Sequence, residues 1–388
     1  MIELLAKKFI SNRENISDSQ VRQQYGVLLG AVGIGFNICL FLIKVVAGFV
    51  SGSVAILADA INNLSDAGSS IVMMVGFKMS GKKPDPEHPF GHGRIEYVTG
   101  LVVSLLIILM GVELVKSSIS KIIHPADVNF SYLVAIILIL SVLVKVYMYF
   151  YNIKASKMYN SAAMKATAMD SLTDSIATLF VLLAMILNMV TGLHVDGISG
   201  LIVASFILYT GVTSAKDTLD PLLGSKPSKE YVQAIENFVS SYDEVIGIHD
   251  LVIHDYGPGR MMISFHAEVA ATSNIVEIHD TIDNIERKLS DTLNCHAVIH
   301  MDPVVVGDEA TDRMKRLTEL IVKSVDESFK IHDFRMVRGN THTNLIFDVV
   351  APYEVKLTEE EIKVAITSKI ESLPGNHYAV IEIDRPYV

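Results

Sequence analysis

The chain has 388 residues, of which 50% are hydrophobic and only 19% are charged. One soluble core of this size has no use for so much apolar surface, so the composition argues against an ordinary soluble protein and predicts a membrane protein. Residues 217–388 hold 16 Lys and Arg against 30 Asp and Glu, a net charge of −14, whereas residues 1–216 carry the remaining +3. We therefore expect a membrane half and an acidic soluble half, and no nucleic-acid partner.

Residues 1–25 contain no long apolar segment followed by a small-residue cleavage site, so we expect a cytosolic N-terminal segment and no removed signal peptide. This fits the plasma membrane of a bacterium. The two cysteines, Cys39 and Cys295, lie in different halves of the chain. They predict neither a disulfide framework nor a zinc site of paired cysteines.

Six apolar runs reach the length of about 20 residues that a bilayer requires. They lie near residues 26–50, 53–78, 96–119, 131–152, 162–190 and 195–215. The sequence therefore predicts a six-helix transmembrane domain over residues 26–216. The first and fourth runs each contain one lysine, Lys44 and Lys145, which either extends to the membrane interface or faces a neighbouring helix.

The distribution of basic residues predicts the orientation in the membrane. Basic residues are concentrated before the first run and in the two loops that follow the second and fourth runs, and we expect these segments to be cytosolic. These residues are Lys7, Lys8, Arg13, Arg22, Lys78, Lys82, Lys83, Arg94, Lys154 and Lys157. The short loops at 51–53 and 191–197 contain no lysine or arginine, although Lys116 and Lys121 lie beside the remaining outer loop. Both termini are predicted to be cytosolic.

After residue 217 the pattern becomes helix, strand, strand, helix, strand, and it then runs a second time. The string "IHDLVIH" at 248–254 matches "IHDFRMV" at 331–337, and "NCHAVIHMD" at 294–302 matches "NHYAVIEID" at 376–384. Coincidence in two short strings is the alternative, but both pairs occur in the same order at nearly one offset. We expect a duplicated small α/β domain over residues 217–304 and 310–388.

Two polar pairs interrupt the second and fifth apolar runs. Asn62 and Asp66 form one pair and Asp170 and Asp174 the other, each spaced i, i+4 and so on one helix face. Carboxylates facing lipid would each cost roughly 2.5–3.5 kcal/mol, so they are expected to face a polar interior at a similar depth. Hydrogen bonds between helices are the alternative role.

Clustered carboxylates repel one another unless a cation or protons neutralise them, which favours a bound divalent cation. The lysine nearest in sequence, Lys165, is expected on another side of its helix. All four candidate ligands are oxygen donors, with no histidine or cysteine in either run. Such a set suits manganese, magnesium or calcium better than zinc or copper.

With these pairs the chain resembles the cation diffusion facilitator family over roughly residues 25–303. The resemblance implies proton-coupled export of divalent metals by a homodimer, with six membrane helices and a ferredoxin-like cytosolic domain that is here duplicated. It places the transport site at Asn62, Asp66, Asp170 and Asp174. A quartet of one asparagine and three aspartates resembles that of the manganese-transporting branch, which implies Mn²⁺ as cargo.

The resemblance also implies two further metal sites and a pair of charges. The stretch "PDPEHPFGHGRIE" is similar to a loop metal site at Asp85, His88 and His92, although a Pro-rich loop also carries solvated histidines without a metal. Arg94 and Asp220 match a basic and an acidic residue that pair at the membrane–cytosol hinge; two unrelated interfacial charges are the alternative. Zn²⁺ or another regulatory divalent metal is implied by the cytosolic positions His249, His266, His279, His300 and Asp302.

In the second repeat, the residues equivalent to His249, His266, His300 and Asp302 are mostly carboxylates: His332, Asp348, Glu382 and Asp384. Ligation there is expected to be absent or harder in character. The resemblance implies no role for this repeat, which we interpret as a dimer-extending or regulatory module.

Neither a phosphate-binding loop nor a phosphorylation motif is present, so an ion gradient is the expected energy source and the protein is expected to be a secondary active transporter, not an enzyme. A zinc, iron or cobalt exporter of the same family is one alternative. A membrane metal sensor or scaffold that does not transport is another.

Overall fold

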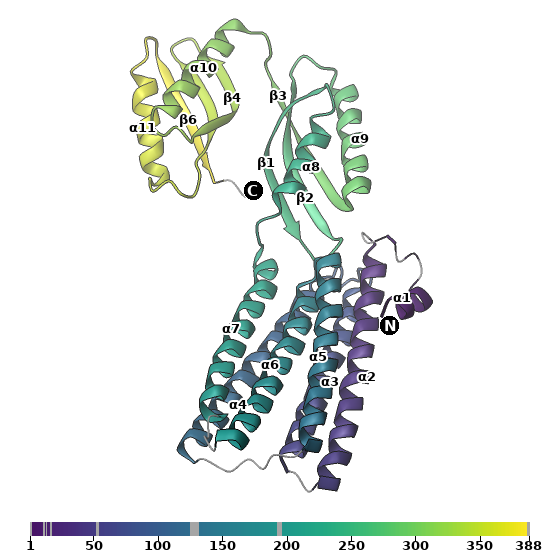
Figure 1. Cartoon of the computed structure of the whole chain (residues 1–388). Coiled ribbons are helices and arrows are strands. Elements are labelled where there is room, and N and C mark those ends of the chain that lie inside the picture. Colours follow the sequence, from purple (N-terminus) through teal and green to yellow (C-terminus); the bar gives the residue numbers. More distant parts are fainter. Residues whose placement is uncertain are drawn as a thin grey trace. The chain divides into compact units, whose positions relative to one another are not determined.

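The computed structural model describes residues 2–10, 12, 14–15, 18–51, 54–124, 132–191 and 196–385. The chain divides into two compact units (Figure 1). The first comprises Met1–Ser225 with Asp255–Arg260, and the second comprises Lys226–His254 with Met261–Val388. The predicted outer loops at 51–53 and 191–197 lie largely outside the described residues.

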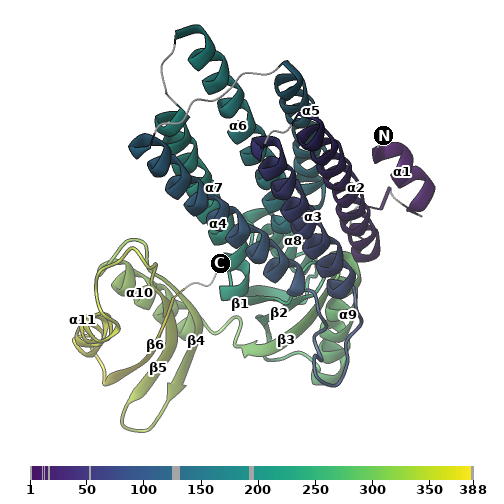
Figure 2. The same cartoon turned by 90° about the horizontal axis from the view of Figure 1, so that it is seen from below.

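The first unit is a bundle of long helices preceded by a short one. Its helices are α1 (Ile2–Phe9), α2 (Ser19–Ser51), α3 (Val54–Ser80), α4 (Ile95–Ile123), α5 (Tyr132–Tyr159), α6 (Ala162–Thr191) and α7 (Asp196–Leu223). The helices pack most extensively in the pairs α2 with α3, α4 with α7 and α5 with α6, and Figure 2 shows the first two of these pairs side by side.

Five of the described helices, α2, α4, α5, α6 and α7, are long and apolar enough to cross a membrane. The sequence predicted six membrane spans, and five of the described helices have the required length and hydropathy. Helix α3 is the exception. Its middle contains a run of polar residues, which lowers its hydropathy: Asn62, Asn63, Ser65, Asp66, Ser69 and Ser70. The residues that weaken the membrane signal thus include two of the predicted metal ligands.

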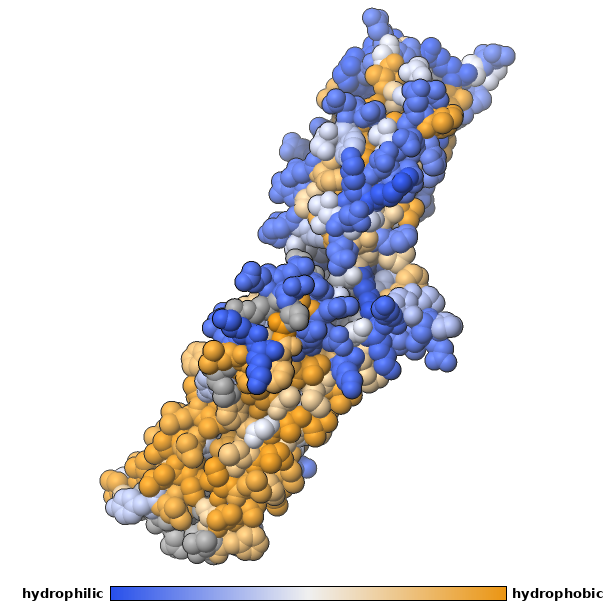
Figure 3. All heavy atoms as spheres, turned by 90° about the vertical axis from the view of Figure 1, so that its right-hand side faces the viewer, coloured by the Kyte–Doolittle hydropathy of each residue, from blue (hydrophilic) through white to orange (hydrophobic). Residues whose placement is uncertain are grey.

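The outside of the bundle is apolar, and its inside contains buried polar groups beside apolar ones. Large side chains such as Leu109, Leu143 and Phe150 are exposed, and Figure 3 shows the hydrophobic surface that such residues form. Lys145 and Asp170 are buried among the helices. A bilayer favours this arrangement, because apolar groups can face lipid while polar groups need partners inside the protein.

The helical unit extends beyond the predicted boundary at residue 216. Helix α7 continues to Leu223, and Lys165 Nζ of α6 lies 2.5 Å from Asp217 Oδ2 of α7. This ion pair holds the last turns of α7 to the bundle, so the composition change at 217 precedes the structural boundary.

The second unit contains the helix, strand, strand, helix, strand order twice. The first set is α8 (Lys229–Val239), β1 (Val245–Asp255), β2 (Met261–Ala270), α9 (Ile275–Leu293) and β3 (Cys295–Val304). The second is α10 (Glu309–Lys323), β4 (Lys330–Arg338), β5 (Thr343–Val350), α11 (Glu359–Glu371) and β6 (His377–Asp384). Each set has its own three-stranded sheet, in the orders β1-β2-β3 and β4-β5-β6.

The same sequence pattern builds both sheets. Alternate residues of β2 and β5, such as Phe265 and Phe347, are buried against helices whose apolar positions recur every three or four residues. Strand β2 pairs in parallel with β3, and β5 pairs in parallel with β6. The register places His266 opposite His300 and Asp348 opposite Glu382, which are the pairs of positions matched by the sequence repeat.

Candidate metal centres

Three aspartates meet inside the helical bundle. Asp66 is in the middle of α3, and Asp170 and Asp174 are one turn apart on α6. One carboxylate oxygen from each lies within 4.8 Å of the others, and all three side chains are buried. Two helices that are far apart in sequence therefore bring together the three acids that the i, i+4 spacing selected.

A lysine lies among these acids. Lys145 of α5 places its Nζ atom 2.7 Å from Asp66 Oδ2 and 2.7 Å from Asp174 Oδ2. The Lys145 side chain is only 4% exposed. Of the two alternatives for this residue, the structure supports the one in which it faces neighbouring helices. Lys165 instead contacts Asp217, so the nearest lysine in sequence is not the nearest in space.

Helix α2 also contributes buried polar groups to the bundle. One of them is Lys44, which is 1% exposed. Ser70 Oγ donates to the Asp66 carbonyl and accepts from Asn37 Nδ2 at 3.3 Å. These contacts join α2 to the turn of α3 that follows Asp66.

Asn62 differs from the other three predicted ligands. It lies one turn before Asp66 on α3, but its side chain is exposed, whereas the adjacent Asn63 is buried. The structure thus brings together three of the four predicted transport-site residues and leaves Asn62 on the outer side of α3.

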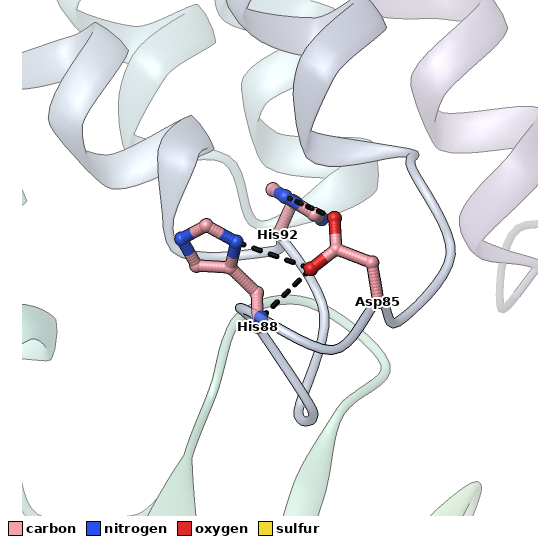
Figure 4. A group of neighbouring side chains, drawn as sticks. All are labelled: Asp85, His88 and His92. Atoms are coloured by element: carbon pink, nitrogen blue, oxygen red, sulfur yellow. Dashed lines mark hydrogen bonds and ion pairs between the residues drawn. The ribbon is translucent and has the colours of Figure 1, made fainter.

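The predicted loop site is assembled from one short segment (Figure 4). Asp85 Oδ1 is 3.3 Å from His88 Nδ1, and Asp85 Oδ2 is 3.4 Å from His92 Nε2. The backbone N–H of His88 donates to Asp85 Oδ1, and this hydrogen bond lowers the pKa of the Asp85 carboxyl. One carboxylate and two imidazoles converge, a donor set that suits a divalent transition metal.

Arg94 contacts the turn at 255–260 rather than Asp220. Its Nε and Nη2 atoms donate to the Asp255 carbonyl at 2.9 and 2.7 Å, and its guanidinium lies 4.6 Å from the Tyr256 ring centroid. Between Arg94 and Asp220, both described, the structure contains no ion pair. Gly257 lies against Gly93 so closely that a Cβ on either would meet backbone atoms within 3 Å.

In the second unit, the first repeat brings most of its predicted ligands together. Asp302 Oδ2 is 2.9 Å from His266 Nδ1 and 3.1 Å from His249 Nε2, and Asp302 Oδ1 is 3.3 Å from His300 Nε2. His279 is exposed on α9 and is not part of this group. Asp250, which the sequence did not single out, accepts from His249 at 3.2 Å.

Comparison with known proteins gives two domain matches. Residues 31–223 match the cation efflux transmembrane domain, and residues 227–304 match the cytoplasmic domain of cation efflux proteins. Neither match includes the second repeat.

Similar proteins match most of the chain. An uncharacterized transporter of Methanocaldococcus jannaschii is 31% identical over 279 residues, covering 72% of this chain and 97% of that protein. The manganese efflux system protein MneP of Bacillus subtilis is 25% identical over 293 residues, covering 73% and 97%. The cation-efflux pump FieF of Escherichia fergusonii is 27% identical over 290 residues, covering 74% and 96%.

Proposed function

Because this chain belongs to the cation efflux family, it is a multi-pass membrane transporter of divalent cations and not an enzyme, and we propose that it exports Mn²⁺ from the cytosol in exchange for protons. The observation that carries the proposal is the convergence of three buried carboxylates from α3 and α6. Carboxylate oxygens suit manganese better than they suit zinc or copper. Similarity to a manganese efflux protein supports the same cargo.

The charges in the cluster match a divalent ion. Asp66, Asp170 and Asp174 with the Lys145 ammonium carry a net charge of −2 when all are ionised. One Mn²⁺ neutralises this charge. Since an uncompensated charge inside a membrane is costly, the cluster must gain protons when the metal leaves. About two protons restore neutrality, so we propose exchange of one metal ion for about two protons.

Lys145 takes a defined part in this cycle. In the absence of metal, its ammonium contacts two of the three carboxylates and reduces their mutual repulsion. Metal binding requires the carboxylates to exchange this contact for coordination of the ion. Lys145 therefore competes with the metal, which lowers affinity and assists release on the outer side.

The remaining features of the proposal follow from the family and the sequence. Helix α3 acts as a sixth span whose buried polar residues face the bundle interior: Asn63, Asp66, Ser69 and Ser70. The short helices and strands form ferredoxin-like cytosolic domains, and two chains assemble as a homodimer. Both termini lie in the cytosol, and the membrane is the plasma membrane. Asn62 completes the transport site if the outer side of α3 lines a water-filled path or contacts the second chain of the homodimer.

Metal uptake into proteoliposomes tests the cargo, the coupling and the site together. We would impose a pH gradient and compare Mn²⁺ with Zn²⁺ for wild type, Asp174→Ala and Glu113→Gln, an exposed acid of α4 as control. We expect gradient-driven Mn²⁺ flux that Asp174→Ala abolishes and Glu113→Gln retains. Mn²⁺ flux of wild-type size in Asp174→Ala would refute the site.

The same assay separates the alternatives. Flux of zinc, iron or cobalt in preference to manganese would keep the mechanism and replace the cargo. No flux of any of these metals, from folded wild-type protein, would favour a metal sensor that uses its cytosolic histidines and does not transport.

A further inference from the structure

The second repeat contains a cluster of metal-binding side chains of its own. His332 of β4, Asp348 of β5 and Asp384 of β6 each offer an atom within 4.8 Å of the others. His332 Nε2 lies 3.0 Å from Asp384 Oδ2, and the register pairs His332 with Asp348. Each of the three strands of this sheet thus supplies one ligand.

This cluster occupies the positions that the first repeat uses for its own group. His332, Asp348 and Asp384 correspond to His249, His266 and Asp302 at the repeat offset. Two ligands are of the same type in both repeats, and only the middle one changes from histidine to aspartate. The second set is one imidazole and two carboxylates, which binds divalent cations and is harder than the first.

His332 provides a second, independent observation. Its side chain is 11% exposed, and its two ring nitrogens are buried. Its Nδ1 atom has no hydrogen-bond partner in the described part of the chain, and its Nε2 atom faces the carboxylates of Asp384 and Asp250. Since buried polar atoms nearly always have a partner, a metal ion bound to a ring nitrogen accounts for this imidazole.

Asp250 joins the two clusters. Its Oδ2 atom lies 3.2 Å from His249 Nδ1 and 3.9 Å from His266 Nδ1 in the first repeat. Its Oδ1 atom lies 3.7 Å from His332 Nε2 in the second. The His249 and His332 rings are 4.4 Å apart between centroids. One carboxylate therefore faces the histidines of both repeats with different oxygens.

The backbone explains how Asp250 reaches this position. Its φ is 51°, in the left-handed region that few residues other than glycine and asparagine or aspartate adopt. Asp333, at the equivalent place in β4, has a φ of 47°. The strand irregularity after each histidine is thus present in both repeats, and in β1 it aims the carboxylate at the second repeat.

We propose that the second repeat binds a divalent cation through His332, Asp348 and Asp384, and that Asp250 is shared between this ion and the one held by the first repeat. The two ions form one centre across the junction of the repeats. Only residues 305–308 connect β3 to α10, so the centre adds a second attachment between the two sheets. The second repeat then senses cytosolic metal by docking on the first.

Counting bound ions tests the second site. We would load the full-length, detergent-purified protein with Zn²⁺ or Mn²⁺ and remove the free metal. Elemental mass spectrometry would then give the number of bound metal ions per chain. Asp348→Asn and Asp384→Asn are each expected to lose one ion relative to wild type. Glu371→Gln is the control, because this acid of the second repeat is exposed at the end of α11 and belongs to none of the three strands that supply ligands.

Hydrogen exchange of the same samples tests the bridge. In wild type, metal should slow exchange in peptides from both sheets and in residues 305–308, whereas in Asp348→Asn and Asp384→Asn it should slow exchange in the first sheet alone. An unchanged ion count in both variants would overturn the second site, as would an equal loss in Glu371→Gln. Equal protection of the second sheet in Asp250→Asn and wild type would overturn the shared carboxylate.

Discussion

The ammonium of Lys145 lies 2.7 Å from Asp174 Oδ2, so α5 supplies an internal cation to an acidic cluster formed by α3 and α6. A metal ion entering this cluster meets the positive charge of Lys145 at short range. Lys145→Met keeps most of the side-chain volume and removes the charge. We expect this variant to bind Mn²⁺ more tightly by at least about tenfold, since even screened repulsion exceeds 1.4 kcal/mol at this range.

Calorimetric titration of the full chain with Mn²⁺ would measure this change. Lys165→Met is the matched control, because Lys165 is also on a membrane helix but pairs with Asp217 at the bundle's exposed end. Equal affinity in Lys145→Met and wild type would show that the ammonium leaves the site before metal enters.

The charge balance of the cluster predicts electroneutral transport. Exchange of one divalent ion for about two protons moves no net charge. Mn²⁺ flux driven by a pH gradient should therefore not change when a potassium diffusion potential of either sign is imposed on the vesicles. A flux that follows the potential would mean another stoichiometry, such as one proton or three per ion.

Asn62 is predicted to influence metal choice although its side chain is exposed on α3. Replacing its amide with an imidazole in Asn62→His introduces a ligand that zinc prefers. We expect the ratio of Zn²⁺ to Mn²⁺ flux to rise by about tenfold, which corresponds to about 1.4 kcal/mol. The adjacent Asn63→His provides the comparison, and an equal effect of both changes would show that neither acts by direct ligation.

Glu96 is predicted to stabilise the end of the bundle at which α4 begins. It is 2% exposed and lies 2.6 Å from Arg22 Nη2, and Ser161 Oγ donates to its Oε1 atom. Glu96→Gln leaves the Arg22 charge without a carboxylate, which we expect to cost about 3 kcal/mol of stability. Thermal unfolding in detergent, followed by circular dichroism, should show a lower midpoint.

Glu113→Gln serves as the control for Glu96→Gln. Glu113 also belongs to α4, but its pair with Lys116 is 3.7 Å long and both side chains are exposed. Such surface pairs contribute about 0–1 kcal/mol. A midpoint shift of the same size in both variants would contradict a special role for the buried pair.

The crowding of carboxylates in the second repeat predicts a pH effect on the metal-free protein. Burial, followed by repulsion from Asp384, raises the pKa of Asp348 to about 6. The folded pKa lies above the unfolded value of about 3.9, so the stability this group contributes is present below about pH 4 and is lost as the pH rises through 6. When a chelator keeps the protein free of metal, Asp348→Asn should therefore slow hydrogen exchange of β5 and β6 near neutral pH relative to wild type. It should have little effect near pH 4, and an equal effect at both would contradict the charge argument.

The sequence alone determined the features that depend on local spacing. Apolar length identified the membrane half, and the i, i+4 spacing placed Asp170 and Asp174 on one face, because helix periodicity is fixed by the backbone. The matching strings in the acidic half predicted the repeated strand order. The position of Asp66 within an apolar run also identified it as a candidate ligand, because an acid that faces lipid would be too costly.

The partners across elements were decided only by the tertiary structure. The direction of Lys145 depends on how α5 is rotated against α3 and α6, and the helical pattern of α5 does not specify this rotation. Asn62 shares a helix face with Asp66 in sequence, yet the packing of the bundle leaves it exposed. Asp250 reaches the second repeat through a left-handed backbone conformation. Each of these contacts joins residues far apart in the chain, and such contacts depend on the packing of whole elements rather than on local spacing.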